Sequence, residues 1–220
     1  MAEGEAPKRT SERSLEALLG VEAIGWNQPG LVLDAGGFFL EPRVRSITDH
    51  LGIPVCKMVF YDSAPRDNLE LRRAGNIFSY LYGDLRRLEF RDGLFNRVVC
   101  ISTLEHIGMD NSRYGGRVEH DPSSWHDAVG ELYRVTKPGG RLFYTMPHGA
   151  AHDAGWYRTF TTQDIHDFGR AHHGTNVSGR VFRLRDPMWT IHEGLNDDPA
   201  VDADGKPTQI IALWVEKPSV

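Results

Sequence analysis

Short apolar runs, each bounded by glycine or polar residues, recur along the chain and predict buried strands. They lie at residues 30–34, 55–61, 77–82, 97–101 and 141–146, and two later runs lie at 180–184 and 209–216. Stretches at residues 41–50, 124–135 and 162–168 favour helices. Apolar strands that alternate with helices are typical of an open sheet covered on both faces. We therefore expect an α/β fold with a seven-stranded, mostly parallel sheet and a C-terminal antiparallel hairpin.

The length of the chain predicts one domain. It has 220 residues, of which 40% are hydrophobic, enough for one sizeable core but short for two. The polar residues 1–13 are predicted to be a disordered tail, and residues 14–220 a single domain that begins with a short helix at 14–19 ending at Gly20. We identify no signal peptide or bilayer-spanning run, and expect a soluble protein without a membrane partner.

Charge and cysteine content limit the kinds of partner and the location that we expect for the protein. A formal net charge of −5 provides no basic surface for a phosphate backbone, so we expect no nucleic-acid partner. The two cysteines, Cys56 and Cys100, each stand in an apolar run, which indicates neither a disulfide framework nor a zinc site. A reducing, cytoplasmic location fits this pattern best.

Polar motifs follow four of the predicted strands. Asp34-Ala35-Gly36-Gly37 closes the first strand, Asp62 ends the second, Gly83-Asp84-Leu85 follows the third, and Ser102-Thr103-Leu104-Glu105-His106 follows the fourth. Open α/β sheets bind ligands at the carboxyl ends of their strands, so these motifs predict a ligand site.

These motifs, with Lys137-Pro138-Gly139-Gly140 before the fifth strand, resemble those of the class I S-adenosylmethionine-dependent methyltransferases over roughly residues 30–170. The resemblance implies a Rossmann-like sheet and S-adenosylmethionine as cofactor. In it, the turn after the first strand lies against the methionine part of the cofactor, Asp62 accepts the ribose hydroxyls, and Asp84 receives the adenine amino group. The residues assigned to the cofactor are Asp34, Gly36, Gly37, Asp62, Asp84, Leu85, Ile101 and Ser102.

The turn after the first strand departs from the family pattern. That pattern is Asp-x-Gly-x-Gly-x-Gly, whereas Phe38 and Leu40 occupy the two later glycine positions here. Two other interpretations stay open: the glycines make only a tight strand-to-helix turn, and Asp84 only caps a turn. A catalytically silent cofactor-binding or scaffold protein is therefore an alternative to an enzyme.

Two histidines are candidates for the catalytic base. The cofactor's sulfonium already activates the methyl group, so the protein must align the acceptor and remove a proton from a hydroxyl or ammonium. Histidine suits that task near neutral pH. His106 follows the fourth strand, His148 follows the fifth, and the sequence leaves the choice between them open.

Residues 109–123 form an insertion that we predict to be a substrate lid. It lies at the mouth of the predicted site. The resemblance implies that Trp156-Tyr157-Arg158 occupies a place where members of the family contact acceptors, although the two aromatic residues could equally pack a loop onto the sheet. The run Arg113-Tyr114-Gly115 after Glu-His-Ile-Gly is similar to a subgroup found among polysaccharide and natural-product genes. We therefore expect a small polar acceptor, such as a sugar or an antibiotic-type natural-product intermediate, and leave a homodimer open. The candidate acceptor residues are Tyr114, His120, Tyr157 and Arg158.

Two other kinds of chemistry, NAD-dependent dehydrogenation and metal binding, have less support in the sequence. Tyr133 and Lys137 have the spacing of a short-chain dehydrogenase pair, but Pro138 biases Lys137 away from the helix and the first turn lacks Gly-x-Gly-x-x-Gly, so NAD is the less favoured cofactor. Four His-Asp dipeptides could supply metal ligands, yet their spacing matches no metal motif, and we expect no metal.

Overall fold

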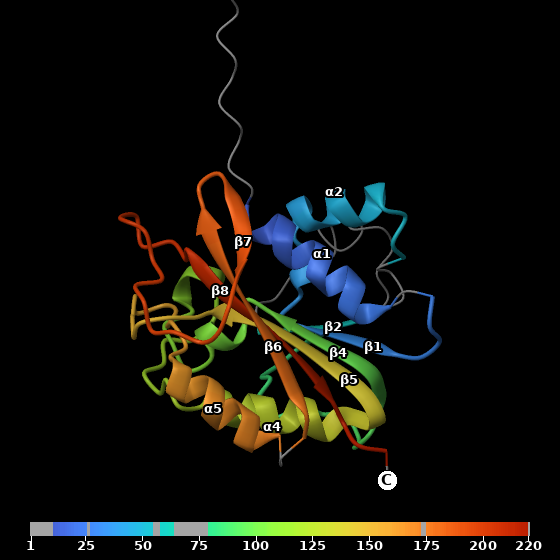
Figure 1. The fold of residues 1–220 in the computed structure, drawn as a ribbon. Helices are drawn as coiled ribbons and strands as arrows, with labels where there is room; N and C mark the ends of the chain where they lie inside the picture. The colour runs from blue at the N-terminus through green and yellow to red at the C-terminus, as the bar shows by residue number, and fades with distance from the viewer. Residues whose placement is uncertain (1–10, 26, 55–57, 64–78, 173–174, 220) are drawn as a thin grey trace, which may run out of the picture.

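The computed structural model describes residues 11–25, 27–54, 58–63, 79–172 and 175–219 (Figure 1). These residues form an eight-stranded sheet in the order β3-β2-β1-β4-β5-β8-β6-β7. The strands are β1 (Val32–Ala35), β2 (Val59–Asp62), β3 (Tyr80–Tyr82), β4 (Phe95–Ile101), β5 (Thr136–Pro147), β6 (Val177–Arg185), β7 (Met188–His192) and β8 (Gln209–Glu216). The helices are α1 (Glu12–Ile24), α2 (Pro42–His50), α4 (Trp125–Val135) and α5 (Thr162–Ala171), and short 3-10 helices are η1 (Phe38–Leu40), η3 (Leu104–His106) and η4 (Ser112–Tyr114).

The sheet has the predicted mixed topology with one additional strand. Strands β1 to β5 are parallel, β8 runs antiparallel between β5 and β6, and β7 pairs antiparallel with β6. The α/β class and the C-terminal antiparallel pairing are confirmed. The prediction of seven strands missed β7, an edge strand in which no side chain is fully buried, so no buried apolar run marks it in the sequence.

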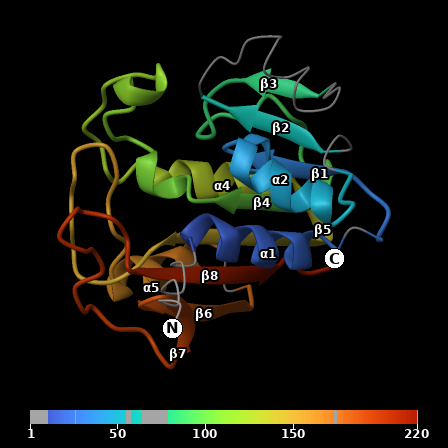
Figure 2. The same cartoon turned by 90° about the horizontal axis from the view of Figure 1, so that it is seen from above.

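Helices cover both faces of the sheet. Figures 1 and 2 show α1 and α2 on one face, and Figure 1 shows α4 and α5 on the other. One apolar cluster lies under α1, η1 and α2, and a second lies between the sheet and α4 and α5. Because β4 is buried on both faces, its sequence is almost continuously apolar.

The first helix is longer than predicted at both ends. Ser11 caps it by accepting a hydrogen bond from the backbone of Ser14, so residues 12 and 13 belong to α1 rather than to a tail. The helix continues through Gly20 and ends before Gly25, which has a φ of 57°. Gly20 fails to end α1 because it serves packing: a Cβ there would lie 2.7 Å from the side chain of Ile101.

Other boundaries were predicted less well. Ser124, the residue before α4, makes no side-chain capping bond, because its hydroxyl donates to the carbonyl of Asp121 over 2.9 Å. A capping box forms instead at the start of α5, between Thr161 and Asp164. Strand β5 begins at Thr136 and so includes Pro138-Gly139-Gly140, which was predicted to precede it. Cys56 lies outside the described residues.

Candidate active site

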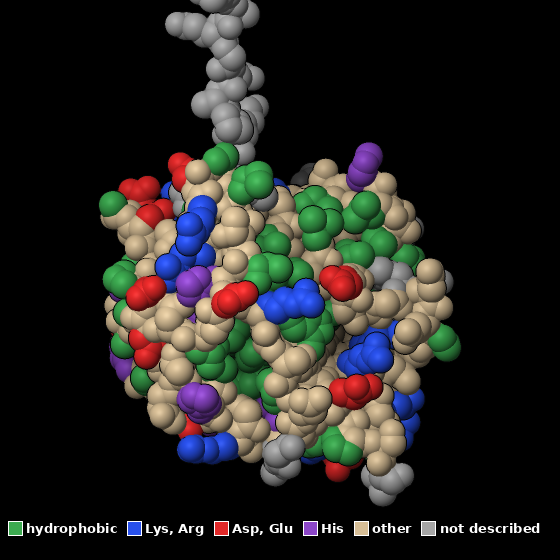
Figure 3. Space-filling model, in the orientation of Figure 1, with side chains coloured by type: hydrophobic (Ala, Val, Ile, Leu, Met, Phe, Trp, Pro, Cys, Tyr) green, Lys and Arg blue, Asp and Glu red, His purple; other side chains and the backbone are tan. Residues whose placement is uncertain are grey.

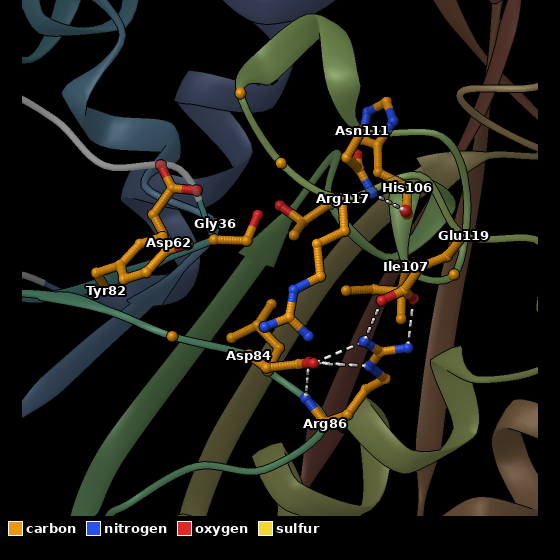
Figure 4. Close-up of a pocket in the computed structure, with 17 residues that line it drawn as sticks. Gly36, Asp62, Tyr82, Asp84, Arg86, His106, Ile107, Asn111, Arg117 and Glu119 are labelled. Atoms are coloured by element: carbon orange, nitrogen blue, oxygen red, sulfur yellow. Dashed lines mark hydrogen bonds and ion pairs between the residues drawn. The ribbon is translucent and has the colours of Figure 1, made fainter.

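A pocket of about 260 Å³ opens at the carboxyl ends of β1 to β4, where the polar motifs were predicted to meet (Figure 4). Of the predicted cofactor and catalytic residues, the structure brings Gly36, Asp62, Asp84, Leu85 and His106 to its wall. Residues of the segment 109–123 form the opposite side of the same pocket. The predicted cofactor residues and the predicted lid are therefore neighbours.

The turn after β1 uses Asp34 to hold its own backbone. The Asp34 carboxylate is fully buried and accepts the N–H groups of Phe38 and Phe39 over 3.2 and 2.9 Å. Gly36 has a φ of 105°, and the side chain of Thr103 occupies the place that a Cβ on Gly36 would need. Asp34 thus shapes the turn, while Gly36 is the residue of this motif that reaches the pocket.

The positions at which the turn after β1 differs from the family pattern lie in the core. Phe38, Phe39 and Leu40 form η1, which follows Gly37 at a φ of 68°, and all three side chains are buried. They pack with α1 and α2 in the apolar cluster on that face. Phe38 and Leu40, which replace the family glycines, therefore face the core.

The second and third strands bring two carboxylates to the pocket. Asp62 ends β2, and Asp84 follows Gly83 after β3, as the sequence predicted. Gly83 leaves room for the hydroxyl of Tyr61, which donates to Glu89 over 3.0 Å. A side chain at position 83 would displace that hydroxyl, so glycine is needed immediately before Asp84.

Arg86 joins Asp84 to the segment 109–123. Its Nε and Nη2 donate to the two Asp84 oxygens over 2.9 and 2.6 Å, and its Nη1 and Nη2 donate to the two Glu119 oxygens over 2.6 and 2.9 Å (Figure 4). Burial alone would raise the pKa of Asp84, but the hydrogen bonds from Arg86 outweigh it and hold that pKa below its usual value. Asp84 is therefore a carboxylate at neutral pH.

Ser102, at the end of β4, is tied to the first helix. It has a φ of 44°, and its hydroxyl donates to Glu16 over 2.6 Å. Glu16 is fully buried and also accepts from Thr145 over 2.5 Å and from Arg13 over 2.9 Å. The carboxylate of Glu16 thereby fastens α1 to β4 and β5. Neither Ser102 nor Ile101 is among the residues that line the pocket.

His106, which lines the pocket, holds one ring nitrogen against a backbone carbonyl. Its Nδ1 lies 2.8 Å from the carbonyl oxygen of Trp156, and because a carbonyl only accepts, Nδ1 holds the proton and Nε2 keeps its lone pair. Burial lowers the pKa of His106 to about 4, against the opposing effect of the Trp156 hydrogen bond. The imidazole is therefore neutral at physiological pH.

Glu105 lies next to this imidazole. Its Oε1 is 3.9 Å from Nε2 of His106, its side chain is 4% exposed, and burial raises its pKa well above the usual range. Its Oε2 has no hydrogen-bond partner among the described residues.

Aromatic rings enclose His106. Trp156 stacks on it at 5.3 Å, and Tyr114 meets its edge at 5.5 Å. The guanidinium of Arg113 lies 3.8 Å from the centre of the Trp156 ring on the side of the segment 109–123. The predicted acceptor residue Tyr114 therefore lies beside the predicted base.

The remaining predicted residues lie apart from the pocket wall. His148 is fully buried, with Nδ1 2.9 Å from the carbonyl of Phe160, and burial lowers its pKa. Tyr157 donates its hydroxyl to the Gly205 carbonyl over 2.6 Å. Arg158 pairs with Asp164 over 2.7 Å, and His120 is exposed. The structure thus separates His148 from the pocket that His106 lines.

Sequence reasoning missed three residues that organise the site: Glu16, Arg86 and Glu119. A carboxylate among the apolar residues of the predicted first helix was a usable signal for Glu16. Arg86 and Glu119 lie 33 positions apart, and nothing in the sequence indicates that they pair. Their role follows only from the return of the segment 109–123 to the ends of the strands.

Several other expectations bear on the class of the protein. Tyr133 bonds to Thr175, and Lys137 donates to Asn96, so this spacing forms no joint site at the pocket. Across the described ranges, no group of three or more His, Cys, Asp or Glu is arranged to hold a metal ion. No described helix combines the length and apolar character needed to cross a bilayer. On the face in Figure 3, basic and acidic side chains are interspersed rather than gathered into one basic patch.

Comparison with known proteins agrees with this geometry. Residues 56–144 match the family model described as a methyltransferase domain, and no curated protein matches the chain. Among solved structures, a Burkholderia thailandensis 1,6-didemethyltoxoflavin N1-methyltransferase with bound S-adenosylhomocysteine has a TM-score of 0.60 at 14% identity, covering 94% of this chain and 78% of that one. A possible histamine N-methyltransferase from Thermotoga maritima has a TM-score of 0.52 at 17% identity, covering 93% and 90%.

The same fold also supports another reaction. The [4+2]-cyclase SpnF has a TM-score of 0.60 at 15% identity, covering 98% of this chain and 86% of that one. Likeness at this level of identity establishes the fold, and the family match adds the class. The match over residues 56–144 and the shared fold together support a class I S-adenosylmethionine-dependent methyltransferase with S-adenosylmethionine as its cofactor.

Proposed function

We propose that this protein transfers the methyl group of S-adenosylmethionine to an oxygen or nitrogen of a small polar acceptor. The observation that carries the proposal is one pocket lined by Asp62, Asp84 and His106, of which His106 has a neutral imidazole. The cofactor supplies a methyl group that its sulfonium already activates. The protein then needs to hold the two reactants in line and to remove one proton.

The residues present fit such a cofactor. Asp62 is an acceptor for the two ribose hydroxyls, and Asp84 is an acceptor for the adenine amino group, because an ionised carboxylate only accepts. Leu85 is buried beside Asp84 and offers an apolar surface to the ring. Gly36 lets the backbone of the turn approach the methionine part. Asp34 and Gly37 contribute through the turn, and Ser102 and Ile101 through the end of β4.

His106 is the base that we favour over His148. His106 lines the same pocket as residues of the segment 109–123, whereas His148 is fully buried and does not line it. Nδ1 stays bonded to the Trp156 carbonyl, which fixes the ring while Nε2 accepts a proton from the acceptor. General bases of this kind contribute about 10²- to 10⁴-fold to a rate.

The acceptor that we favour is a sugar or a natural-product intermediate of secondary metabolism. The Burkholderia thailandensis neighbour is named for N-methylation of a small molecule, and the interspersed surface charge supports a small ligand rather than nucleic acid. Tyr114 lies beside His106, where it would contact the acceptor. The buried, free Cys100 is compatible with a reducing cytoplasm.

A second candidate is a protein that binds the cofactor without transferring its methyl group. Two observations favour it: Phe38 and Leu40 replace family glycines, and a neighbour with this fold is named as a cyclase. In this case S-adenosylmethionine would bind, but no acceptor would be methylated.

Calorimetric titration with S-adenosylmethionine, S-adenosylhomocysteine and NAD tests the cofactor, and transfer of radiolabelled methyl to a panel of sugars, phenols and amines tests the activity. We expect binding of the first two ligands only, followed by transfer to a member of the panel. With that acceptor, His106→Ala should lower turnover about 10²-fold or more with unchanged S-adenosylhomocysteine affinity, whereas a loss confined to His148→Ala would reassign the base.

A further inference from the structure

One guanidinium connects two parts of the pocket that come from distant parts of the chain. Arg86 holds Asp84, two residues before it, and Glu119, on the segment 109–123, with paired hydrogen bonds of 2.6 to 2.9 Å on each side. Its Nη1 also lies 3.4 Å from the hydroxyl of Ser124, at the start of α4. All three nitrogens of the guanidinium are therefore engaged, and they orient both carboxylates.

The arrangement requires arginine. Both carboxylates are met side-on by two nitrogens of one planar group, a geometry that the single ammonium of lysine does not reproduce. Asp84 has little acceptor capacity left, because the backbone N–H of Arg86 also donates to its Oδ1 over 2.9 Å. A further donor at Asp84 must therefore share or replace a bond from Arg86.

The same segment reaches the other end of the pocket. Asn111 donates its side-chain amide to the carbonyl oxygen of His106 over 2.8 Å. Glu119 and Asn111 thus attach the segment 109–123 at two points, one beside Asp84 and one beside the candidate base (Figure 4). Arg86 is therefore bonded to the same segment that contacts the candidate base.

We propose that Arg86 is a positioning residue that couples occupation of the nucleoside end of the pocket to the placement of the segment 109–123. When a donor from the ligand takes part of the Asp84 carboxylate, Arg86 shifts its bonding towards Glu119 and holds the segment more firmly. By linkage, a firmly held segment also favours the ligand at Asp84. The inference rests on the proposed function, because it places the cofactor's adenine at Asp84.

Calorimetric titration with S-adenosylhomocysteine tests the coupling without an identified acceptor. The variants are Asp84→Asn, Glu119→Gln and their combination, each made with Arg86 and again with Arg86→Met. With Arg86 present, we expect Glu119→Gln to weaken S-adenosylhomocysteine binding about threefold, the size typical of a partly exposed ion pair. In a chain that already carries Asp84→Asn, the same substitution should have a smaller effect. With Arg86→Met, the effect of Glu119→Gln should disappear.

Equal effects of Glu119→Gln in both backgrounds would overturn the proposal, because Glu119 would then act on the ligand directly. Asp167→Asn, which breaks the exposed Asp167–Arg170 pair on α5, is the matched control and should leave binding unchanged. Arg86→Lys should behave as Arg86→Met, and its rescue of the coupling would refute the need for two paired contacts.

Hydrogen exchange of residues 109–123 provides a second readout if the Arg86 variants fold poorly. Bound S-adenosylhomocysteine should protect this segment more in the wild type than in Glu119→Gln at equal saturation, and equal protection would overturn the proposal. A wild-type chain that does not bind S-adenosylhomocysteine at all would instead overturn the proposed function.

Discussion

Glu16 links the first helix to the sheet. Its carboxylate is fully buried, accepts hydrogen bonds from the hydroxyls of Ser102 and Thr145 at Oε1, and pairs with Arg13 through Oε2. We predict that Glu16→Ala loosens α1 and lowers the free energy of unfolding, because both hydroxyls and the guanidinium lose this partner at once.

The magnitude follows from these three contacts. Each hydrogen bond to a charged group contributes about 1.5 to 3 kcal/mol, but removing the carboxylate also removes its cost of burial. Breaking a buried charged network from one side typically costs about 3 to 5 kcal/mol. Arg13 keeps a weaker partner in Glu41 at 3.5 Å, so we expect about 3 kcal/mol. Glu16→Gln keeps an acceptor for the hydroxyls and should cost less.

Urea unfolding followed by far-UV circular dichroism measures the change. Glu22→Ala on the same helix is the matched control: Glu22 is exposed, and its replacement should change stability by less than about 0.5 kcal/mol. Hydrogen exchange of the α1 amides should become faster in Glu16→Ala and stay unchanged in the control. A Glu16→Ala protein as stable as the control would show that packing alone holds α1, and would refute the reasoning.

Two further outcomes are expected. Asp62→Ala should weaken S-adenosylhomocysteine binding about tenfold or more in calorimetry, by loss of charge-assisted hydrogen bonds to the ribose, and unchanged affinity would place the ribose elsewhere. Burial, reinforced by Glu16 and Glu41 against the opposing Arg13, raises the pKa of Glu12 from 4.5 to about 8. The folded chain thus keeps a proton that the unfolded chain has released, so this contribution to stability is complete below about pH 4.5 and lost as the pH rises through about 8. Glu12→Gln should make urea stability less dependent on pH across this window, and a dependence equal to that of the wild type would contradict the assignment.

The sequence was sufficient where burial is continuous and insufficient where geometry depends on partners. Strand β4 was predicted with its end at Ile101 correct and its start two residues late, because its continuous apolar run covers only residues 98–101. Strand β7 was missed, since an edge strand needs no buried run. Gly20 was taken as a helix end because glycine usually marks one, but a tertiary contact with Ile101 determines its role.

The candidate site shows the same division. The strand-end motifs correctly brought Asp62, Asp84 and His106 to one pocket, because parallel strands end on one edge of a sheet. The partners of these side chains were beyond prediction. The bonding of Asp84 to Arg86, and the tautomer of His106 set by the Trp156 carbonyl, arise from loops with positions that no periodicity encodes.

The altered turn after β1 and the helix α1 pack against each other and depend on each other's residues. Phe38 and Phe39 form a buried platform under α1, and Gly20 lets the helix approach Phe39, whose ring would lie 3.0 Å from a Cβ at that position. That close approach brings Glu16 to the hydroxyl of Ser102 at the end of β4. Asp34 meanwhile satisfies the backbone N–H groups of the turn. The residues that replace the family glycines therefore belong to a fully packed and hydrogen-bonded arrangement, which argues for an exchange of one turn architecture for another rather than for the decay of a site.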